Sequence, residues 1–196
     1  MRTAIIDIET SGFDAQGSIV LCAVIKEYNG RGNGKITVIR TDEFPTWKNN
    51  KSNDEPIIRA IMKHLDGDRD KGIEGFDIIV AHNGEWFDKA FLTAKCIEYR
   101  IPPTLRHKKS IDPVLLSRRY MRLNRNGLGV LINFLNVPHK KTPVSLSHWR
   151  KASLDGNAGS MQYIVEHCIA DVKALDRVYH EVKSLVDKID SRGSQF

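Results

Sequence analysis

Hydrophobic residues in the last third of the chain recur with a helical period. The spacings are three and four residues, as expected when one face of a helix is apolar. The stripe consists of Ile164, Cys168, Val172, Leu175, Tyr179, Val182, Val186 and Ile189. It predicts one long helix that packs on a large partner, such as a sheet.

The first half of the chain shows short apolar runs rich in β-branched residues, which are typical of strands. We expect strands over 2–9, 19–26 and 35–40, with the Gly/Asn-rich stretch 29–34 as a hairpin loop. The apolar run 76–81 predicts a short buried strand.

Further helices are predicted between and after these strands. The expected ranges are 54 to about 65, 86–99, 114–123 and 128–135. Strands that come first, followed by alternating helices and strands, indicate an α/β fold with helices on the faces of a sheet. We expect a single domain over 1–190 and a polar tail over 191–196.

Composition places the chain among ordinary soluble proteins. Of its 196 residues, 41% are hydrophobic and 28% are charged, and no apolar run approaches the ~20 residues that span a bilayer. Asp7 and Glu9 interrupt the first apolar stretch, so we expect no signal peptide. Cys22, Cys96 and Cys168 are far apart and form no CxxC pair. We interpret them as reduced, buried residues of a cytoplasmic protein.

The charge is distributed unevenly. The segment 100–151 contains twelve Lys or Arg and one acid, Asp112, and carries +11, whereas the rest of the chain carries −5, which together give the net +6. Such a basic block suits a polyanionic partner, most commonly a nucleic acid. Alternatively, it is a solvated face that improves solubility.

Asp7 and Glu9 are two residues apart on the first predicted strand. The period of two places both side chains on the same face of the sheet. Their neighbours are apolar, and two carboxylates near a core repel each other and lose hydration unless a cation lies between them. The pair therefore predicts a metal site, unless the strand ends early and both acids are solvated.

Two further acids lie at places where a site could form. Asp88 follows the buried strand 76–81, near the start of a helix, where the helix dipole alone could account for it. Asp171 lies in the last helix beside the apolar stripe, where the alternative role is an exposed partner of a residue one turn away.

Taken together, these motifs resemble the DEDD (DnaQ-like) superfamily of 3′–5′ exonucleases, which includes polymerase proofreading domains and RNA-trimming enzymes. Asp7-Ile8-Glu9-Thr10 is similar to its first motif, Asn83 to Leu92 to its second, and His167 to Val172 to its third. The stretch from Lys141 through Trp149 and Gly156 to Asp171 also resembles the lead-in to the third motif in small exonuclease-like proteins. The resemblance covers nearly the whole chain and implies a ribonuclease-H-like mixed sheet flanked by helices.

The resemblance also implies the chemistry. Two Mg²⁺ or Mn²⁺ ions would be held by Asp7, Glu9, Asp88 and Asp171. Hard cations take carboxylate oxygens, and a pair of them can activate water and stabilise the leaving 3′ oxygen. The implied activity is removal of nucleotides from single-stranded 3′ ends of DNA or RNA.

The third motif departs from the family pattern. One branch has Tyr four residues before the last Asp, and the other has His five residues before it. Here His167 lies four residues before Asp171, and Glu166 lies five before. A neutral imidazole can act as the base, so we expect His167 to serve in the tyrosine position; alternatively it is a surface residue.

Substrate contacts are expected from three places. Thr10 and Ser11 follow the first acid pair and match the family's first-motif neighbours, Asn83 opens the second motif, and Arg118 and Arg119 belong to the basic block. Two alternatives remain, namely a nucleic-acid-binding module that has lost turnover and a structure-selective endonuclease. The sequence indicates no membrane partner and no particular protein partner.

Overall fold

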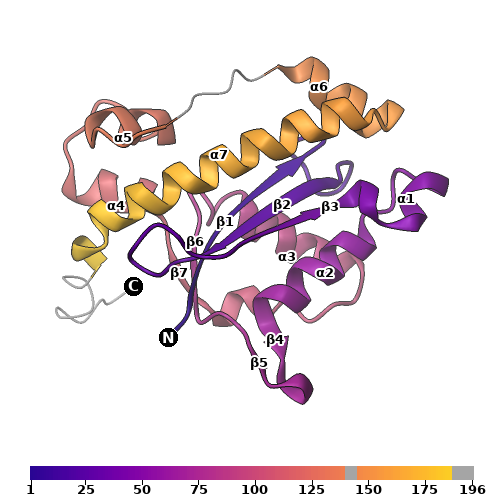
Figure 1. The fold of residues 1–196 in the computed structure, drawn as a ribbon, viewed down its shortest axis with the longest axis horizontal. Helices are drawn as coiled ribbons and strands as arrows, with labels where there is room; N and C mark the ends of the chain where they lie inside the picture. The colour runs from indigo at the N-terminus through magenta and orange to yellow at the C-terminus, as the bar shows by residue number, and fades with distance from the viewer. Residues whose placement is uncertain (140–144, 187–196) are drawn as a thin grey trace.

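A five-stranded mixed sheet forms the centre of the computed structural model, which describes residues 1–139 and 145–186 (Figure 1). The strand order is β3-β2-β1-β6-β7, in which β2 is antiparallel to β1 and β3, β6 is parallel to β1, and β7 is parallel to β6. The strands are β1 (Thr3–Thr10), β2 (Val20–Glu27), β3 (Ile36–Arg40), β6 (Ile78–Val80) and β7 (Lys109–Ile111).

Helices cover both faces of this sheet. The 25-residue helix α7 (Ala158–Val182) crosses one face and packs on β1 and β2, while α2 (Glu55–Asp66) and α3 (Asp88–Glu98) lie on the other (Figure 1). Alternation along β1 supplies both cores: Ile5 contacts the α7 side, and Ile6 and Ile8 contact the α2 and α3 side. The predicted α/β architecture is therefore confirmed.

Smaller elements join these layers. A two-stranded hairpin, β4–β5, follows α2, and α4 and α5 lie against the C-terminal half of α7 (Figure 1). The bounds are α1 (Pro45–Asn49), β4 (Gly67–Asp68), β5 (Ile73–Glu74), α4 (Pro113–Tyr120), α5 (Leu128–Phe134) and α6 (Leu146–Arg150). Single turns of other helix types cover Thr41–Glu43, Arg69–Lys71, Thr104–His107 and Lys151–Asp155.

Two of the predicted helices have a boundary that lies two or three residues from the observed one. The helix expected from 86 begins at Asp88, because residues 82–87 form a turn in which Asn83 has a φ of 59°. The helix expected to reach 123 ends at Tyr120. The first three strands lie within one residue of their predicted bounds. Ile189 and the tail 191–196 lie outside the described residues.

Two irregularities of the sheet surround the C-terminal half of β1. The short strand β6 pairs with β1 only from Thr3 to Ile5, so within the described residues the remainder of β1 has no strand neighbour on that side. On the other side, the pairing with β2 shifts between Glu9 and Thr10, so that β2 carries one extra residue there. Such a bulge bends the strand and is common beside active sites.

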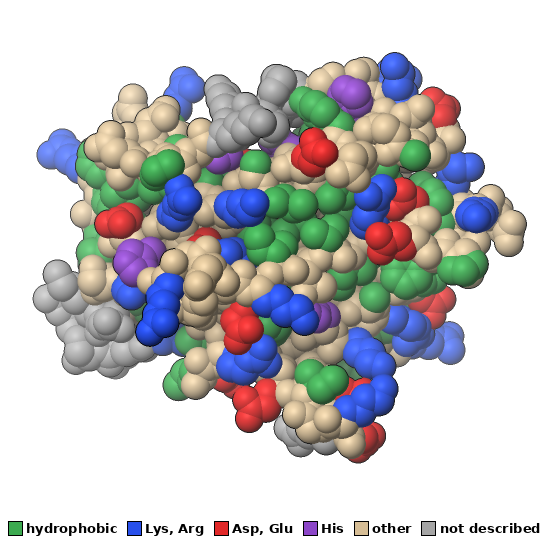
Figure 2. Space-filling model, in the orientation of Figure 1, with side chains coloured by type: hydrophobic (Ala, Val, Ile, Leu, Met, Phe, Trp, Pro, Cys, Tyr) green, Lys and Arg blue, Asp and Glu red, His purple; other side chains and the backbone are tan. Residues whose placement is uncertain are grey.

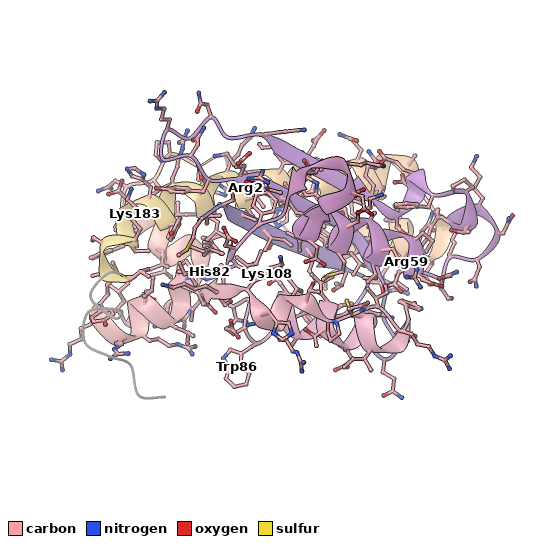
Figure 3. The ribbon with its side chains drawn as sticks, turned by 90° about the horizontal axis from the view of Figure 1, so that it is seen from below. Arg2, Arg59, His82, Trp86, Lys108 and Lys183 are labelled. Carbon is pink, nitrogen blue, oxygen red and sulfur yellow. The ribbon has the colours of Figure 1, made fainter. Side chains whose placement is uncertain are left out.

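The side of the molecule seen in Figure 2, where α7 lies above the β3 edge of the sheet and α2 below it, carries mixed charges. Figure 2 shows hydrophobic side chains gathered near its middle, with basic and acidic side chains spread around them. This face therefore offers no uniformly basic track for a polyanion. None of the helices in the described residues is long and apolar enough to cross a membrane.

Candidate active site

Asp7 and Glu9 lie on the α7 face of β1, and each has a hydrogen-bond donor from the C-terminal third of the chain. The Cys168 thiol of α7 donates to Asp7, with Sγ 3.1 Å from Oδ2 and 3.4 Å from the main-chain oxygen. The indole of Trp149 in α6 donates from Nε1 to Glu9 Oε2 at 3.0 Å. Both carboxylates are thus fixed by elements distant in sequence.

Asp88 approaches β1 at the edge of the strand that faces β6. It is the first residue of α3, only 4% exposed, and its Oδ1 accepts the main-chain N–H of Ile8 at 3.0 Å. This bond forms where β6 has already ended, so a carboxylate takes the position of a strand partner. The preceding turn is tight at Gly84, because a Cβ there would lie 2.2 Å from the Cβ of Ala81.

Asp171 completes the group from α7 and lies between two imidazoles. His167, one turn earlier, has Nε2 3.6 Å from Oδ2, and His139, from the segment after α5, has Nε2 3.8 Å from Oδ1. His167 is only 9% exposed, so the surface role considered from the sequence is wrong. Its ring meets the Trp149 ring edge to face, with the centroids 5.7 Å apart.

The electrostatics show that the four acids share one environment. Loss of hydration raises the pKa of Asp7 well above its ordinary value, and the neighbouring Asp88 and Glu9 carboxylates raise it further. Burial raises the pKa of Glu9 to about 8 against the Trp149 hydrogen bond, and the pKa of Asp88 to about 7 against the Ile8 amide. Burial also raises the pKa of Asp171, although both histidines oppose the change.

These features fit a divalent-cation site. Carboxylates that are buried together resist ionisation, and a cation among them offsets both the lost hydration and the mutual repulsion. Carboxylate oxygens are the donors that Mg²⁺ and Mn²⁺ prefer. The ligand atoms of Asp7, Glu9 and Cys168 lie within 4.8 Å of one another, a separation compatible with one shared ion.

The other predicted site residues are arranged less directly. Thr10 is buried, and its hydroxyl donates to the main-chain oxygen of Gly12 at 2.6 Å, while Ser11 Oγ accepts the amide of Ile19 at 3.0 Å. Asn83 is exposed in the turn before Asp88. Arg118 and Arg119 are exposed in the last turn of α4, whose N-cap residue Asp112 accepts the amide of Asn83.

Several residues around the acids were not predicted from the sequence. The sequence indicated Trp149 only through the family resemblance, it indicated Cys168 as a buried residue but not as a contact of the acids, and it did not indicate His139. Asp112 was noted only as the single acid of the basic block, yet its Oδ1 accepts the amides of Asn83 and Val114 and so joins the Asp88 turn to α4. An isolated acid directly before a proline and a helix was the available signal.

The comparisons with known proteins agree with this fold. The family model of the RNase H superfamily matches residues 4–183, and the chain belongs to this superfamily. No curated protein matches it. Among solved structures, it is similar to the family B DNA polymerase from the hyperthermophilic archaeon Pyrobaculum calidifontis, with a TM-score of 0.65 and 13% identity over 96% of this chain. The chain spans 24% of that polymerase's length.

Superfamily membership supports a nuclease, and the likeness to the polymerase supports a ribonuclease-H-like fold. The sheet has the predicted mixed pairing and is flanked by helices on both faces. Nucleases of this fold generally use divalent metals, in keeping with the acidic cluster around Asp7 and Glu9.

Proposed function

We propose that this protein is a 3′–5′ exonuclease that removes nucleotides from single-stranded ends of DNA or RNA. The observation that carries the proposal is the convergence of Asp7, Glu9, Asp88 and Asp171, in the DEDD order, at a place where burial raises the pKa of each carboxyl group. These four side chains would hold two Mg²⁺ or Mn²⁺ ions. When bound, such ions neutralise phosphate charge and favour the ionisation of water.

The surrounding residues of this chain would place the four acids and move the proton. The Trp149 indole holds Glu9, and the Ile8 amide holds Asp88, so both carboxylates are oriented before any ion binds. His167 Nε2 would accept the proton of the attacking water, since its imidazole lies beside Asp171. His167 thus takes the role that the tyrosine branch gives to Tyr.

The end of the nucleic acid would lie next to the acids. A polar cavity of about 400 Å³ adjoins β1 and is lined by Ser11, Lys51 and Arg150 among others. These side chains offer hydroxyl and cationic donors for phosphates and sugars. We therefore assign Ser11 to contact with the terminal nucleotide. Thr10 and Asn83 do not line this cavity, and we assign them to the same role from the family resemblance alone.

One experiment tests both activity and direction. The full chain is incubated with single-stranded DNA and RNA oligonucleotides labelled at the 5′ end, with Mg²⁺, with Mn²⁺ and with EDTA. We expect a metal-dependent ladder that shortens from the 3′ end and stops when that end is blocked by a phosphorothioate linkage. Cleavage of closed circles would instead identify an endonuclease, and binding without cleavage in either metal would identify a module without turnover.

We expect Arg118 and Arg119 to contact phosphates upstream of the end. The double substitution to Glu should lower affinity for all sequences by about tenfold or more, because contacts with phosphates do not depend on the base sequence. The dependence of log K on log salt should also become less steep, by ~0.7–0.9 for each phosphate contact that is lost. Fluorescence anisotropy with a labelled oligonucleotide at several salt concentrations measures both quantities.

The matched control substitutes Glu for Lys63 and Lys71, which are also exposed and lie near Asp68 beside the β4–β5 hairpin. It changes the net charge by the same amount. Equal losses in the two double variants would show that only net charge matters and that α4 makes no phosphate contact. An unchanged salt slope in the α4 variant would have the same meaning.

A further inference from the structure

The Cys168 thiol contacts Asp7 within the acidic site, although hard cations such as Mg²⁺ bind oxygen in preference to sulfur. It is buried, on the side of α7 that faces β1, and its Sγ is 3.1 Å from Asp7 Oδ2. Cys96 belongs to the core on the opposite face of the sheet, whereas Cys22 lies opposite Glu9 on β2 and its side chain contacts the Cys168 thiol. Only Cys168 among these three joins the group of possible ligand atoms with Asp7 and Glu9.

The geometry of this group suits a tetrahedral ion with mixed ligands. Around Zn²⁺, sulfur lies at ~2.3 Å and carboxylate oxygen at ~2.0–2.2 Å, which places neighbouring ligand atoms of a tetrahedron roughly 3.3–3.8 Å apart. The Sγ–Oδ2 distance of 3.1 Å is close to that spacing, and all three ligand atoms lie within 4.8 Å of one another. Small side-chain movements would therefore close the triad on one ion.

We propose that Cys168, Asp7 and Glu9 form a binding site for a borderline-soft divalent cation such as Zn²⁺, with the cysteine sulfur as a direct ligand. The proposal rests on the proposed function for the two carboxylates and adds the sulfur. On binding, the S–H bond breaks, its proton leaves to solvent, and a sulfur–metal bond forms. Two carboxylates and one thiolate leave the fourth tetrahedral position open to water.

With this ligand set, the site would bind hard cations and thiophilic cations in two different ways. With Mg²⁺, which demands oxygen ligands, the thiol remains a hydrogen-bond donor to Asp7. With Zn²⁺, Co²⁺ or Cd²⁺, the sulfur would be a ligand. The ion would then lie closer to Cys168 and further from Asp88 and Asp171. Thiophilic ions should thus compete with Mg²⁺ and leave the rest of the acids without their cation.

The direct test is spectroscopic and does not depend on activity. The full chain, kept reduced, is titrated with Cd²⁺ and with Co²⁺ and followed by ultraviolet absorption, in which a metal–thiolate bond gives a charge-transfer band. We expect a band that saturates at one equivalent and is absent in Cys168→Ser, with Cd²⁺ affinity lower by about tenfold or more. Serine keeps the donor to Asp7 and removes only the sulfur.

Controls separate this proposal from the nuclease assignment. Cys96→Ser makes the same change in the opposite core and should retain the band, and Cys168→Ala provides a second sulfur-free chain if serine disturbs folding. Mn²⁺ binding, measured by electron paramagnetic resonance, should persist in Cys168→Ser. Saturable Cd²⁺ binding without a charge-transfer band, or a band that survives in both Cys168 variants, would overturn the sulfur ligand and leave the oxygen site intact. Loss of all divalent binding in the parent chain would instead remove the proposed function.

Discussion

Asp7→Asn is expected to lower the hydrolysis rate by about 10³-fold, because a bound cation contributes several kcal/mol to the transition state and each ~1.4 kcal/mol corresponds to tenfold in rate. Asparagine matches aspartate in shape and can still accept the Cys168 hydrogen bond, so folding should be retained. The measurement is the single-turnover rate on a 5′-labelled oligonucleotide in Mn²⁺. Asp14→Asn, the same change at an exposed position, should keep the parent rate.

Stability gives a second readout of the same substitution. Folding raises the pKa of Glu9 to about 8 and that of Asp88 to about 7, whereas both groups titrate near ~4 in an unfolded chain. A carboxyl group with a raised folded pKa favours the folded state only while it is protonated. The free energy of unfolding should therefore fall as the pH rises from ~4 to about 8 when no divalent ion is present.

Asp7→Asn removes one charge from this group, so in EDTA the variant should be more stable than the parent at pH 8 and less different at pH 5. Urea unfolding at the two pH values measures this difference, and Mn²⁺ should raise the stability of the parent more than that of the variant. A variant that cleaves at the parent rate, or a parent whose stability in EDTA does not decline toward pH 8, would contradict the assignment of these acids.

His167→Ala is expected to lower the rate by ~10²–10⁴-fold with Mn²⁺ binding retained, as the loss of a general base does. His139 provides the matched control, since both imidazoles approach Asp171, at 3.6 Å for His167 and 3.8 Å for His139. His139→Ala should cost less than ~10-fold, because only His167 shares the spacing of the tyrosine branch. His167→Tyr should recover part of the lost rate.

The decisive comparison is the rank of the two alanine variants. Single-turnover rates, with the metal-binding isotherm of each variant, separate loss of a base from loss of a cation. A larger effect at His139 would transfer the role of base to that residue. Full rates in both variants would mean that water is activated without either imidazole.

The sequence predicted the elements that have a strong period and missed those that depend on tertiary contacts. The stripe through Ile164 and Val182 identified α7, and the β-branched runs identified β1 to β3 within one residue. Strand β7 has three residues, of which only Ile111 is buried, so it carries no readable alternation. Helix α6 has no buried residue and was not predicted.

The same distinction applies to the site. The order of Asp7, Glu9, Asp88 and Asp171 is visible in one dimension, because each acid lies on or beside an element with a clear pattern. The contacts that orient them are not visible, since Trp149 reaches Glu9 from a five-residue helix and His139 reaches Asp171 from a connecting segment. No spacing rule links residues 140 positions apart.

The shortness of β6 has a consequence for solubility as well as for the site. A strand edge with free amide and carbonyl groups is a template for pairing with another chain and hence for aggregation. Beyond Ile5 the side of β1 that faces β6 would be such an edge, but Asp88 accepts the Ile8 amide there and carries a group that becomes charged near neutral pH. The acid at the start of α3 therefore also protects the central strand of the fold from intermolecular pairing.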